Sequence, residues 1–300
     1  MILVGTGDMA REYARVFRAM GKSFSTIGNT ENGSKIFYDW AWSNGILTDV
    51  HPGGVVHNRI ESTEAVVAVP IIDLFDVTKN LILKGVKKIL IEKPGCLYSI
   101  QARALISLAE SKGADLRVAY NRRFFNSVQS ARTIIRRDGV SRLFFCFGDD
   151  MNWVEDSAHP QSVKDRWIIA NSSHCIDSAL FITGEPVQGL FVETVKPFRG
   201  SGFAGDIPFH YQTDWHKDKR WRIEFTTKRG EQYYLSPMEL LMRREEEGQD
   251  TVVAYDSDPE LKPGVSAMMK SFLAGGEDLP TMEEQLERIK LYMRIGGLNE

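Results

Sequence analysis

A glycine-rich turn near the start of the chain has the residue types and spacing that bind a dinucleotide. Residues 5–10 read Gly-Thr-Gly-Asp-Met-Ala, and they follow the short apolar run Ile2–Val4. In such a turn Gly5 permits the tight bend, Gly7 lets the backbone approach a pyrophosphate, and Ala10 allows the next helix to pack on the strand. The phosphates then lie at the N-terminus of that helix. The nucleotide site predicted by this motif contains Gly5, Thr6, Gly7, Asp8, Met9 and Ala10.

A lysine that follows a second apolar run is the best candidate for acid–base chemistry. Residues 88–91 are followed by Glu92, Lys93, Pro94 and a glycine. In a doubly wound sheet the carboxyl ends of the strands face the ligand crevice, so we expect Lys93 on the cofactor side. A partly desolvated lysine beside a cationic nicotinamide is suited to take a hydroxyl proton while hydride leaves the same carbon. The alternative is an ordinary solvated lysine at a strand end.

Composition and charge exclude several other classes of protein. The 300 residues are 43% hydrophobic and 10% aromatic, enough for a large core and, at this length, two domains. A net charge of −3 gives no general attraction to nucleic acid or to anionic membranes. No apolar run reaches the roughly 18 residues of a membrane span, and we expect a cytoplasmic protein. The three widely spaced cysteines and the six histidines lack metal-ligand spacing, so no disulfide or metal is expected.

Residues 1–120 alternate between short β-rich runs and helical patterns. This alternation predicts an α/β domain with a doubly wound parallel sheet, the Rossmann arrangement. Glycines that follow the helical patterns mark their ends, as Gly113 does for the pattern over 99–112. The expected strands are 2–4, 23–27, 65–69, 88–91 and 116–120, and the expected helices are 11–20, 34–42, 73–84 and 99–112.

The order of elements changes in residues 121–300, which we expect to form a second domain. Long β-like runs without intervening helices predict an α+β domain with an open, mainly antiparallel sheet. A last helical pattern over 282–297 begins after Thr281 as N-cap, and we expect it to pack back on the first domain. The expected strands are 142–147, 189–196, 210–215, 221–227 and 232–235, and the other expected helices are 127–138, 173–183 and 266–273.

Taken together, the motifs resemble the Gfo/Idh/MocA family, named for glucose-fructose oxidoreductase, inositol dehydrogenase and MocA. The resemblance covers essentially the whole chain and implies a Rossmann domain followed by a substrate-binding domain with an open sheet. Members of this family mostly oxidise or reduce one carbon of a sugar, cyclitol or sugar nucleotide. Six segments carry the resemblance in the family's order: 5–10, Ala68-Val69-Pro70, Glu92-Lys93-Pro94, 119–124, 173–177 and 279–284.

The resemblance implies roles for individual residues. Lys93 corresponds to the proton-transfer residue, and His174 to the residue that contacts the reacting oxygen. Many members have an aspartate four residues before this histidine, where this chain has Ala170, and Asn171 is expected to supply a hydrogen bond instead. For His174 a buried core histidine is the alternative reading, and for Asp177 a structural salt bridge is favoured over catalysis.

The other implied site residues come from the strand ends and the crossover between the domains. The expected substrate-binding residues are Asn171, Tyr120 and Arg122. The expected cofactor-binding residues beyond the glycine turn are Asn29, Val69, Pro70, Glu92, Lys93 and Asn121.

The end of the second strand bears on the form of the cofactor. NAD-binding folds usually place an acid there for the ribose 2′-hydroxyl, and this chain has Asn29. A neutral side chain does not repel a 2′-phosphate, so either NAD or NADP is expected, with NADP slightly favoured.

The expected partners are a small carbohydrate substrate and further copies of this chain. Residues 189–235 carry many apolar and aromatic side chains, which we expect on both faces of the open sheet, so we predict a homo-oligomer, a dimer or tetramer. Two other functions remain open: a non-catalytic NAD(P)-binding regulator, and an NAD-using glycosidase of the same fold.

Overall fold

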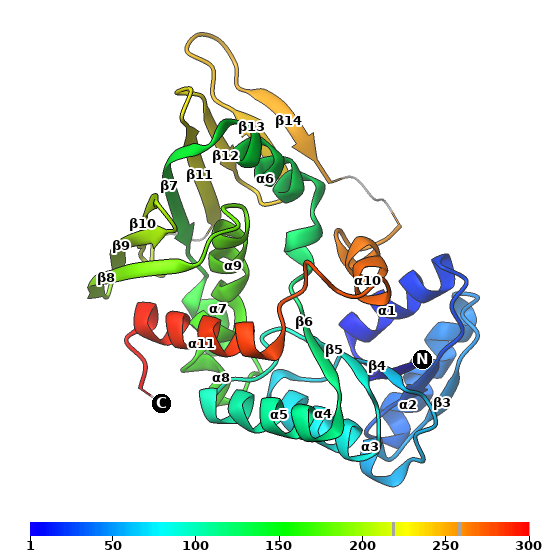
Figure 1. Cartoon of the computed structure of the whole chain (residues 1–300). Helices are drawn as coiled ribbons and strands as arrows, with labels where there is room; N and C mark the ends of the chain where they lie inside the picture. Colours follow the sequence, from blue (N-terminus) through cyan, green and yellow to red (C-terminus); the bar gives the residue numbers. More distant parts are fainter. Residues whose placement is uncertain (218–219, 257–259, 300) are drawn as a thin grey trace. The chain divides into compact units, whose positions relative to one another are not determined.

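The structure, a computed structural model, describes residues 1–217, 220–256 and 260–299 (Figure 1). The chain divides into two compact units, Met1–Tyr120 with Pro259–Ile289 and Asn121–Asp258 with Lys290–Glu300. A six-stranded parallel sheet forms the first, and an eight-stranded, mainly antiparallel sheet forms the second. The α/β fold class predicted from the sequence is confirmed. Among the helices that the structure describes, none has the length and apolarity needed to cross a membrane.

The sheet of the first unit has the strand order β3-β2-β1-β4-β5-β6, and every neighbouring pair is parallel. Its strands are β1 (Ile2–Val4), β2 (Ser25–Ile27), β3 (Asp49–His51), β4 (Glu64–Val67), β5 (Lys88–Glu92) and β6 (Asp115–Ala119). The helices begun in this unit are α1 (Asp8–Ala19), α2 (Glu31–Ser43), α3 (Gly54–His57), η1 (Ile71–Asp73), α4 (Leu74–Leu83), α5 (Ser99–Lys112), α10 (Val265–Leu273) and α11 (Met282–Gly296).

The central strands of this sheet are apolar because both of their faces are covered. Leu3 of β1, Val66 of β4 and Leu90 of β5 are completely buried. Helix α5 matches the predicted span, and Gly113 ends it in the left-handed conformation at φ 61°. Since the strands are parallel, the carboxyl ends of β1, β4 and β5 lie at one edge of the sheet. This edge positions the candidate cofactor residues.

Residues 260–289 belong to the first unit and residues 290–299 to the second. The sequence predicts the second domain over all of 121–300, with the last helix packing back on the first. Two backbone contacts join residues 260–289 to β6: Arg117 pairs with Thr281 in an antiparallel bridge, and the Val118 amide donates to the Pro280 carbonyl at 3.0 Å. Helix α11 then begins with a capping box. The Glu284 amide donates to Thr281 Oγ1, and the Thr281 amide donates to the Glu284 carboxylate. Thr281 is therefore the N-cap, as the sequence predicts.

The second unit has the strand order β14-β13-β12-β11-β7-β10-β9-β8, in which β7 and β10 are the parallel pair. Its strands are β7 (Val140–Phe147), β8 (Val187–Val195), β9 (Phe198–Ala204), β10 (Ile207–Thr213), β11 (Trp221–Thr227), β12 (Gln232–Leu235), β13 (Leu240–Arg243) and β14 (Thr251–Tyr255). Its helices are η2 (Asn121–Phe124), α6 (Asn126–Asp138), α7 (Met151–Asp156), α8 (Gln161–Lys164), the π-helical turn η3 (Ile168–Ser172) and α9 (Ser173–Phe181).

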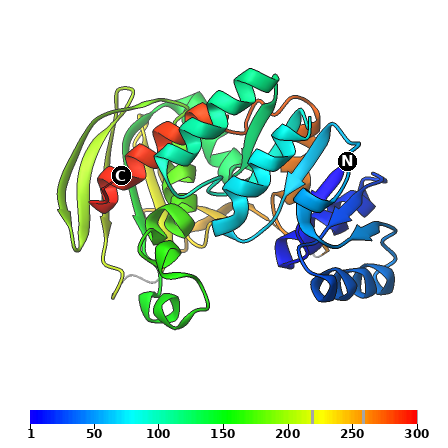
Figure 2. The ribbon, with the colours of Figure 1, turned by 90° about the horizontal axis from the view of Figure 1, so that it is seen from below.

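One face of the large sheet forms the core of the second unit. Tyr211, Phe145, Ile223 and Leu235 lie side by side across β10, β7, β11 and β12, and all are at most 1% exposed. Helices α6 and α9 pack on the sheet. Figure 2 shows α9 beside the sheet, with no helix of the described residues over the outer face of β8, β9 and β10.

The opposite face of the sheet is polar rather than apolar at its centre. Glu224 forms ion pairs with Arg222 at 2.8 Å and with Arg244 at 3.7 Å, while both arginines lie over the Tyr234 ring. The expectation of apolar side chains on both faces is wrong for Ile223, Phe225, Tyr233 and Leu235, since the strand register turns all four toward the helices. Phe191 of that expected set is exposed.

A buried ion pair joins the start of the second unit to α9. Arg123 donates from Nε and Nη2 to the two carboxylate oxygens of Asp177, each at 2.7 Å, and both side chains are at most 5% exposed. The two parallel hydrogen bonds are the geometry in which arginine binds a carboxylate most strongly. Asp177 is therefore part of a structural salt bridge, as favoured from the sequence.

The two glycines of the first turn should respond differently to substitution. Gly5 has φ +124°, and a Cβ there would lie 2.1 Å from the Ala68 carbonyl oxygen, whereas a Cβ on Gly7 meets no atom within 4 Å. Gly5→Ala should therefore lower the free energy of unfolding by about 2–4 kcal/mol. Gly7→Ala is the matched control and should change it by less than about 0.5 kcal/mol. Urea denaturation measures both, and equal stability of the two variants would contradict the packing argument.

Candidate functional site

The N-terminus of α1 is built to receive an anion. Gly7 is its N-cap, at φ −81° and ψ −170°, and no side chain caps the helix. The first backbone amides of the helix therefore face the opening of the turn, where the helix dipole favours negative charge. The open space in front of Gly7 leaves room for a pyrophosphate. These features fit a dinucleotide.

The end of β2 is held by backbone hydrogen bonds and carries no acid at residue 29. The Gly28 amide donates to the His51 carbonyl, and the Gly54 amide donates to the Gly28 carbonyl. Asn29 is exposed, and Thr30 caps α2 by accepting from the Gly33 amide at 3.1 Å. The position next to the expected adenosine ribose is therefore neutral and open to solvent.

The turn that carries Lys93 is fixed from two sides within the first unit. On one side, Tyr13 of α1 donates its hydroxyl to Glu92 Oε1 at 2.7 Å, and both side chains are buried. On the other, Gln285 of α11 donates from Nε2 to the Pro94 carbonyl at 2.9 Å and to the Tyr120 hydroxyl at 3.2 Å. Lys93 itself is half-buried. The turn is therefore rigidly held, whereas its lysine keeps access to solvent.

Burial dominates the electrostatics of Glu92. Its removal from water raises the pKa of this carboxyl above the usual 4.5, and the Tyr13 hydrogen bond and the charges of Lys93 and Lys262 oppose the rise. The pKa of Tyr13 is raised well above 10.0 by its own burial and by Glu92. A protonatable pair therefore lies directly behind the candidate catalytic lysine.

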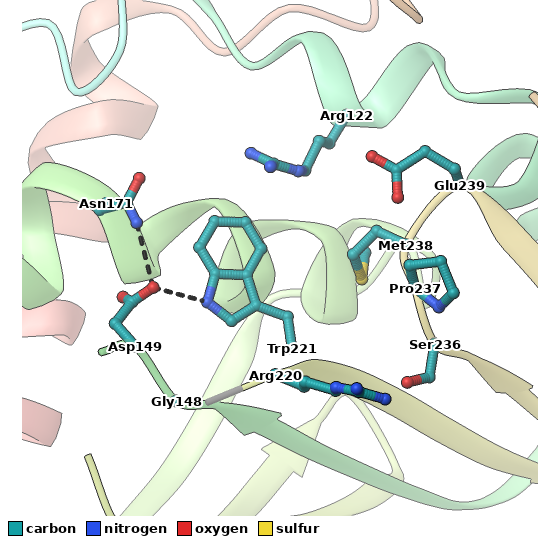
Figure 3. A pocket seen from close by; sticks show the side chains of 10 residues that line it. All are labelled: Arg122, Gly148, Asp149, Asn171, Arg220, Trp221, Ser236, Pro237, Met238 and Glu239. Atoms are coloured by element: carbon teal, nitrogen blue, oxygen red, sulfur yellow. Dashed lines mark hydrogen bonds between the residues drawn. The ribbon is translucent and has the colours of Figure 1, made fainter. Parts of the chain in front are cut away.

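A cavity of about 550 Å³ lies in the second unit (Figure 3). Its lining comes from the η2 turn, the end of β7, the η3 turn, the start of β11 and the loop between β12 and β13. The lining residues are Arg122, Gly148, Asp149, Asn171, Arg220, Trp221, Ser236, Pro237, Met238 and Glu239. Its size suits a small polar molecule.

Asp149 organises one wall of this cavity. Its Oδ1 accepts from Asn171 Nδ2 and Trp221 Nε1, each at 3.2 Å. Its Oδ2 accepts from Ser172 Oγ at 2.7 Å and Trp167 Nε1 at 3.0 Å. Burial raises the pKa of this carboxyl, and the four hydrogen bonds oppose the rise. One carboxylate thus fixes the orientation of two indoles and of the η3 turn.

The π-helical turn explains how η3 reaches Asp149. A π-turn widens the helix by one residue and turns its side chains relative to a regular α-helix, and such turns are frequent at functional sites. Here it presents both Asn171 and Ser172 to the same carboxylate. His174 follows in α9, is 5% exposed, and its ring centre lies 6.0 Å from that of Trp221.

Arg122 covers the indole of Trp221. Its guanidinium carbon lies 4.3 Å from the ring centre, a cation–π contact. Burial lowers the pKa of this arginine to about 10, and the charge of Glu239 opposes the shift. Figure 3 shows the guanidinium and the Glu239 carboxylate both directed into the cavity.

The residues predicted from the sequence fall into two groups. At the carboxyl edge of the first sheet lie the glycine turn, Val69 and Pro70 after β4, and Glu92 and Lys93 at the end of β5. In the second unit, Arg122 and Asn171 line the cavity. His174 is not among the described residues that line it, Tyr120 is buried in the first unit, and Asn121 is buried at the start of η2.

Asp149, Trp221 and Glu239 were not among the site residues predicted from the sequence. The signal for Asp149 was the pair Asp149-Asp150, which follows the apolar run of β7 after a single glycine. Its partners come from three distant segments, which no local pattern reveals. Trp221 was counted only among the apolar and aromatic side chains of residues 189–235, and the structure places it in the cavity wall.

Comparison with models of protein families and with curated proteins found no match to this chain. Solved structures match almost its whole length. A Gfo/Idh/MocA family oxidoreductase from Vibrio cholerae is 14% identical, with a TM-score of 0.73 over 99% of this chain and 96% of that one. UDP-N-acetylglucosamine 3-dehydrogenase from Acidithiobacillus ferrooxidans is 16% identical, with a TM-score of 0.70 over 99% and 96%.

A third match is an oxidoreductase from Agrobacterium radiobacter, solved with NAD⁺, L-tartaric acid and magnesium. It is 13% identical, with a TM-score of 0.73 over 99% of this chain and 95% of that one. At such identities the likeness shows the fold. This chain therefore has the two-domain fold of the Gfo/Idh/MocA oxidoreductases, which confirms the resemblance at the level of structure.

Removing the Asp149 carboxylate should destabilise the second unit. Asp149→Ala leaves four buried or half-buried donors without their acceptor, and we expect a loss of about 2–4 kcal/mol in the free energy of unfolding. The neighbouring Asp150 caps α7 by accepting from the Trp153 amide at 3.4 Å. Asp150→Ala is the control, with an expected loss of about 1 kcal/mol or less. Chemical denaturation followed by tryptophan fluorescence measures both, and equal losses would contradict the role given to Asp149.

Stability should depend on pH through Glu92. Because the folded state raises the pKa of this carboxyl above 4.5, the protonated form favours folding, and that stabilisation is lost as the pH rises through the folded pKa. Glu92→Gln keeps the acceptor for Tyr13 and removes the charge, so it should raise the melting temperature above neutral pH. The difference from the parent should vanish near pH 4.

Melting curves of parent and Glu92→Gln across this pH range measure the effect. Glu110→Gln, at an exposed position of α5, controls for the loss of one negative charge. A melting difference for Glu92→Gln that grows toward low pH would have the wrong sign and would overturn the assignment.

Proposed function

We propose that this protein is an NAD(P)-dependent oxidoreductase that moves hydride between a nicotinamide cofactor and a carbon of a sugar, cyclitol or sugar nucleotide. The observation that carries the proposal is the meeting of the uncapped glycine turn and the Lys93 turn at one edge of a parallel sheet. The NAD⁺ bound by the Agrobacterium radiobacter protein of the same fold supports it. The expected cytoplasmic location is part of this proposal.

In the proposed mechanism, residues 5–10 hold the pyrophosphate at the N-terminus of α1. A nicotinamide dinucleotide held there would supply the hydride acceptor or donor. Lys93 takes the proton of the substrate hydroxyl as its carbon is oxidised, and returns it in the reverse direction. Glu92, held by Tyr13 behind the turn, and Gln285 keep this lysine in place.

We propose that the second unit binds the substrate. Arg122 and Asn171 contribute from the cavity wall, and His174 from the start of α9. Asn171 donates its amide to Asp149, so its Oδ1 points away from that carboxylate and is available to accept from a hydroxyl (Figure 3). The hydrogen bond to Asp149 orients the Asn171 side chain.

The form of the cofactor follows from Asn29. A neutral, exposed side chain at the end of β2 neither binds the 2′-hydroxyl as an acid would nor repels a 2′-phosphate. We propose that NADP binds at least as tightly as NAD. The proposal also includes a homo-oligomer that buries the open face of the large sheet, where Phe191 and Phe203 are exposed.

Gly7 tests cofactor binding. Gly7→Val introduces a branched side chain into the open space of the turn, where the pyrophosphate is proposed to lie, and should lower the affinity for NAD and NADP by about a hundredfold or more. The free space around this position leaves the fold intact. Titration of both dinucleotides by calorimetry measures the effect. Unchanged affinity in a folded Gly7→Val protein would refute the assigned site.

Substitution of Lys93 tests the proposed proton transfer. Lys93→Met should lower the turnover rate by about a hundredfold or more while the cofactor affinity stays within a few-fold. His174→Ala should also be impaired, and the double variant should be little slower than the worse single variant if both residues serve one step. Steady-state kinetics on a verified substrate measure this. A Lys93→Met enzyme at the parent rate would favour the non-catalytic regulator.

A further inference from the structure

The Arg122 guanidinium is a half-buried positive charge that has no ion partner among the residues that the structure describes. Its Nε is sealed from solvent and has no hydrogen-bond acceptor, and the side chain forms no ion pair with any residue in the described ranges. Its contact is with the face of Trp221. Burying a charge without a partner is costly, and the cost appears as the lowered pKa of this arginine. Such an arrangement is favourable once an anion enters the cavity.

The other charged groups around Arg122 do not neutralise it. Both oxygens of Asp149 are engaged by four donors from indole, amide and hydroxyl groups. The Glu239 carboxylate acts on Arg122 through space and forms no ion pair with it among the described residues. The Cys175 thiol has a raised pKa because it is buried and so stays neutral. Arg220, on the cavity rim, is exposed and adds a second positive charge.

The arrangement of donors and acceptors defines the ligand. A guanidinium presents two parallel N–H groups to the two oxygens of one carboxylate. Across the cavity, Glu239 and the Oδ1 of Asn171 offer acceptors for hydroxyl groups. A phosphate dianion would bring two negative charges beside Asp149 and Glu239, so the charge balance favours a single negative charge.

We propose that the substrate is a polyhydroxy acid, held by its carboxylate on Arg122 and by hydroxyl groups on Glu239 and Asn171. This inference rests on the proposed function and narrows its substrate class from carbohydrates in general to sugar acids. The Trp221 ring packs against the guanidinium, and the indole N–H of Trp221 donates a hydrogen bond to Asp149, which fixes the ring. The preference for a carboxylate is therefore set by Arg122.

The test compares acids with neutral sugars of the same configuration. D-galacturonate is paired with D-galactose and D-glucuronate with D-glucose, and D-galactose 6-phosphate serves as the phosphate probe. Binding to the cofactor-loaded protein is measured by saturation-transfer NMR and calorimetry, without turnover. At least one acid should bind about tenfold or more tightly than its neutral partner. Acids that bind no better than neutral sugars overturn the inference, as does tighter binding of the phosphate.

Variants assign the effect to one side chain. Arg122→Met keeps much of the apolar stem over Trp221 and should lower the affinity for the acid about tenfold or more, with a clearly smaller effect on the neutral sugar. Arg122→Lys keeps the positive charge but lacks the two parallel N–H groups of the guanidinium. This variant should lose part of the affinity for the acid. Arg136→Met, at an exposed position of α6, is the control and should change nothing. Acid binding that survives Arg122→Met in a folded protein overturns the inference.

The two proposals fail in different ways. If an acid binds through Arg122 and no sugar or acid exchanges hydride with NAD or NADP, the proposed oxidoreductase function fails while the anion site stands. If neutral sugars are oxidised and acids neither bind nor react, the function stands and the sugar-acid inference fails.

Discussion

The close approach of two backbones at Gly5 is the constraint on which the first unit depends. The turn after β1 passes so near the Ala68 carbonyl at the end of β4 that no Cβ fits, and this approach aligns the carboxyl ends of β1, β4 and β5. The start of α1 and the Lys93 turn are thereby presented at the same edge. Tyr13 of α1 donates its hydroxyl to Glu92. The helix that would bind phosphate therefore also fixes the candidate catalytic turn.

In the second unit the Asp149 carboxylate is the comparable structural constraint. Asp149 receives hydrogen bonds from β11, from the η3 turn and from Trp167, and so connects segments up to 72 residues apart. Its neighbour in the cavity, Arg122, lacks such partners within the described part of the chain. The Asp149 carboxylate is hydrogen-bonded within the protein, whereas the Arg122 guanidinium is the proposed binding point for the ligand's anion.

Local sequence rules predicted the elements whose ends carry glycine or a capping residue. Helix α5 ends at Gly113 and α11 begins after Thr281, both as expected. The predicted strands omitted β9, whose Phe-Arg-Gly-Ser-Gly-Phe-Ala sequence has low β propensity. Its glycines are required because the Tyr211 hydroxyl and the Phe209 ring occupy the space that a Cβ at 200 or 202 would fill. Local patterns also could not predict the Asp149 cluster or the cavity. The residues that form them are distant in sequence and are brought together by the register of the large sheet.

Hydride transfer to a nicotinamide is the central claim, and isotope transfer tests it most directly. The purified protein would be incubated with NAD⁺ or NADP⁺ and the small-molecule extract of cells grown in heavy water, whose sugars and sugar acids carry deuterium on carbon. We expect deuterium on one face of the nicotinamide C4 in the reduced cofactor, with unlabelled extract and heat-inactivated protein as controls. Absence of deuterium at that carbon with both cofactors would contradict it.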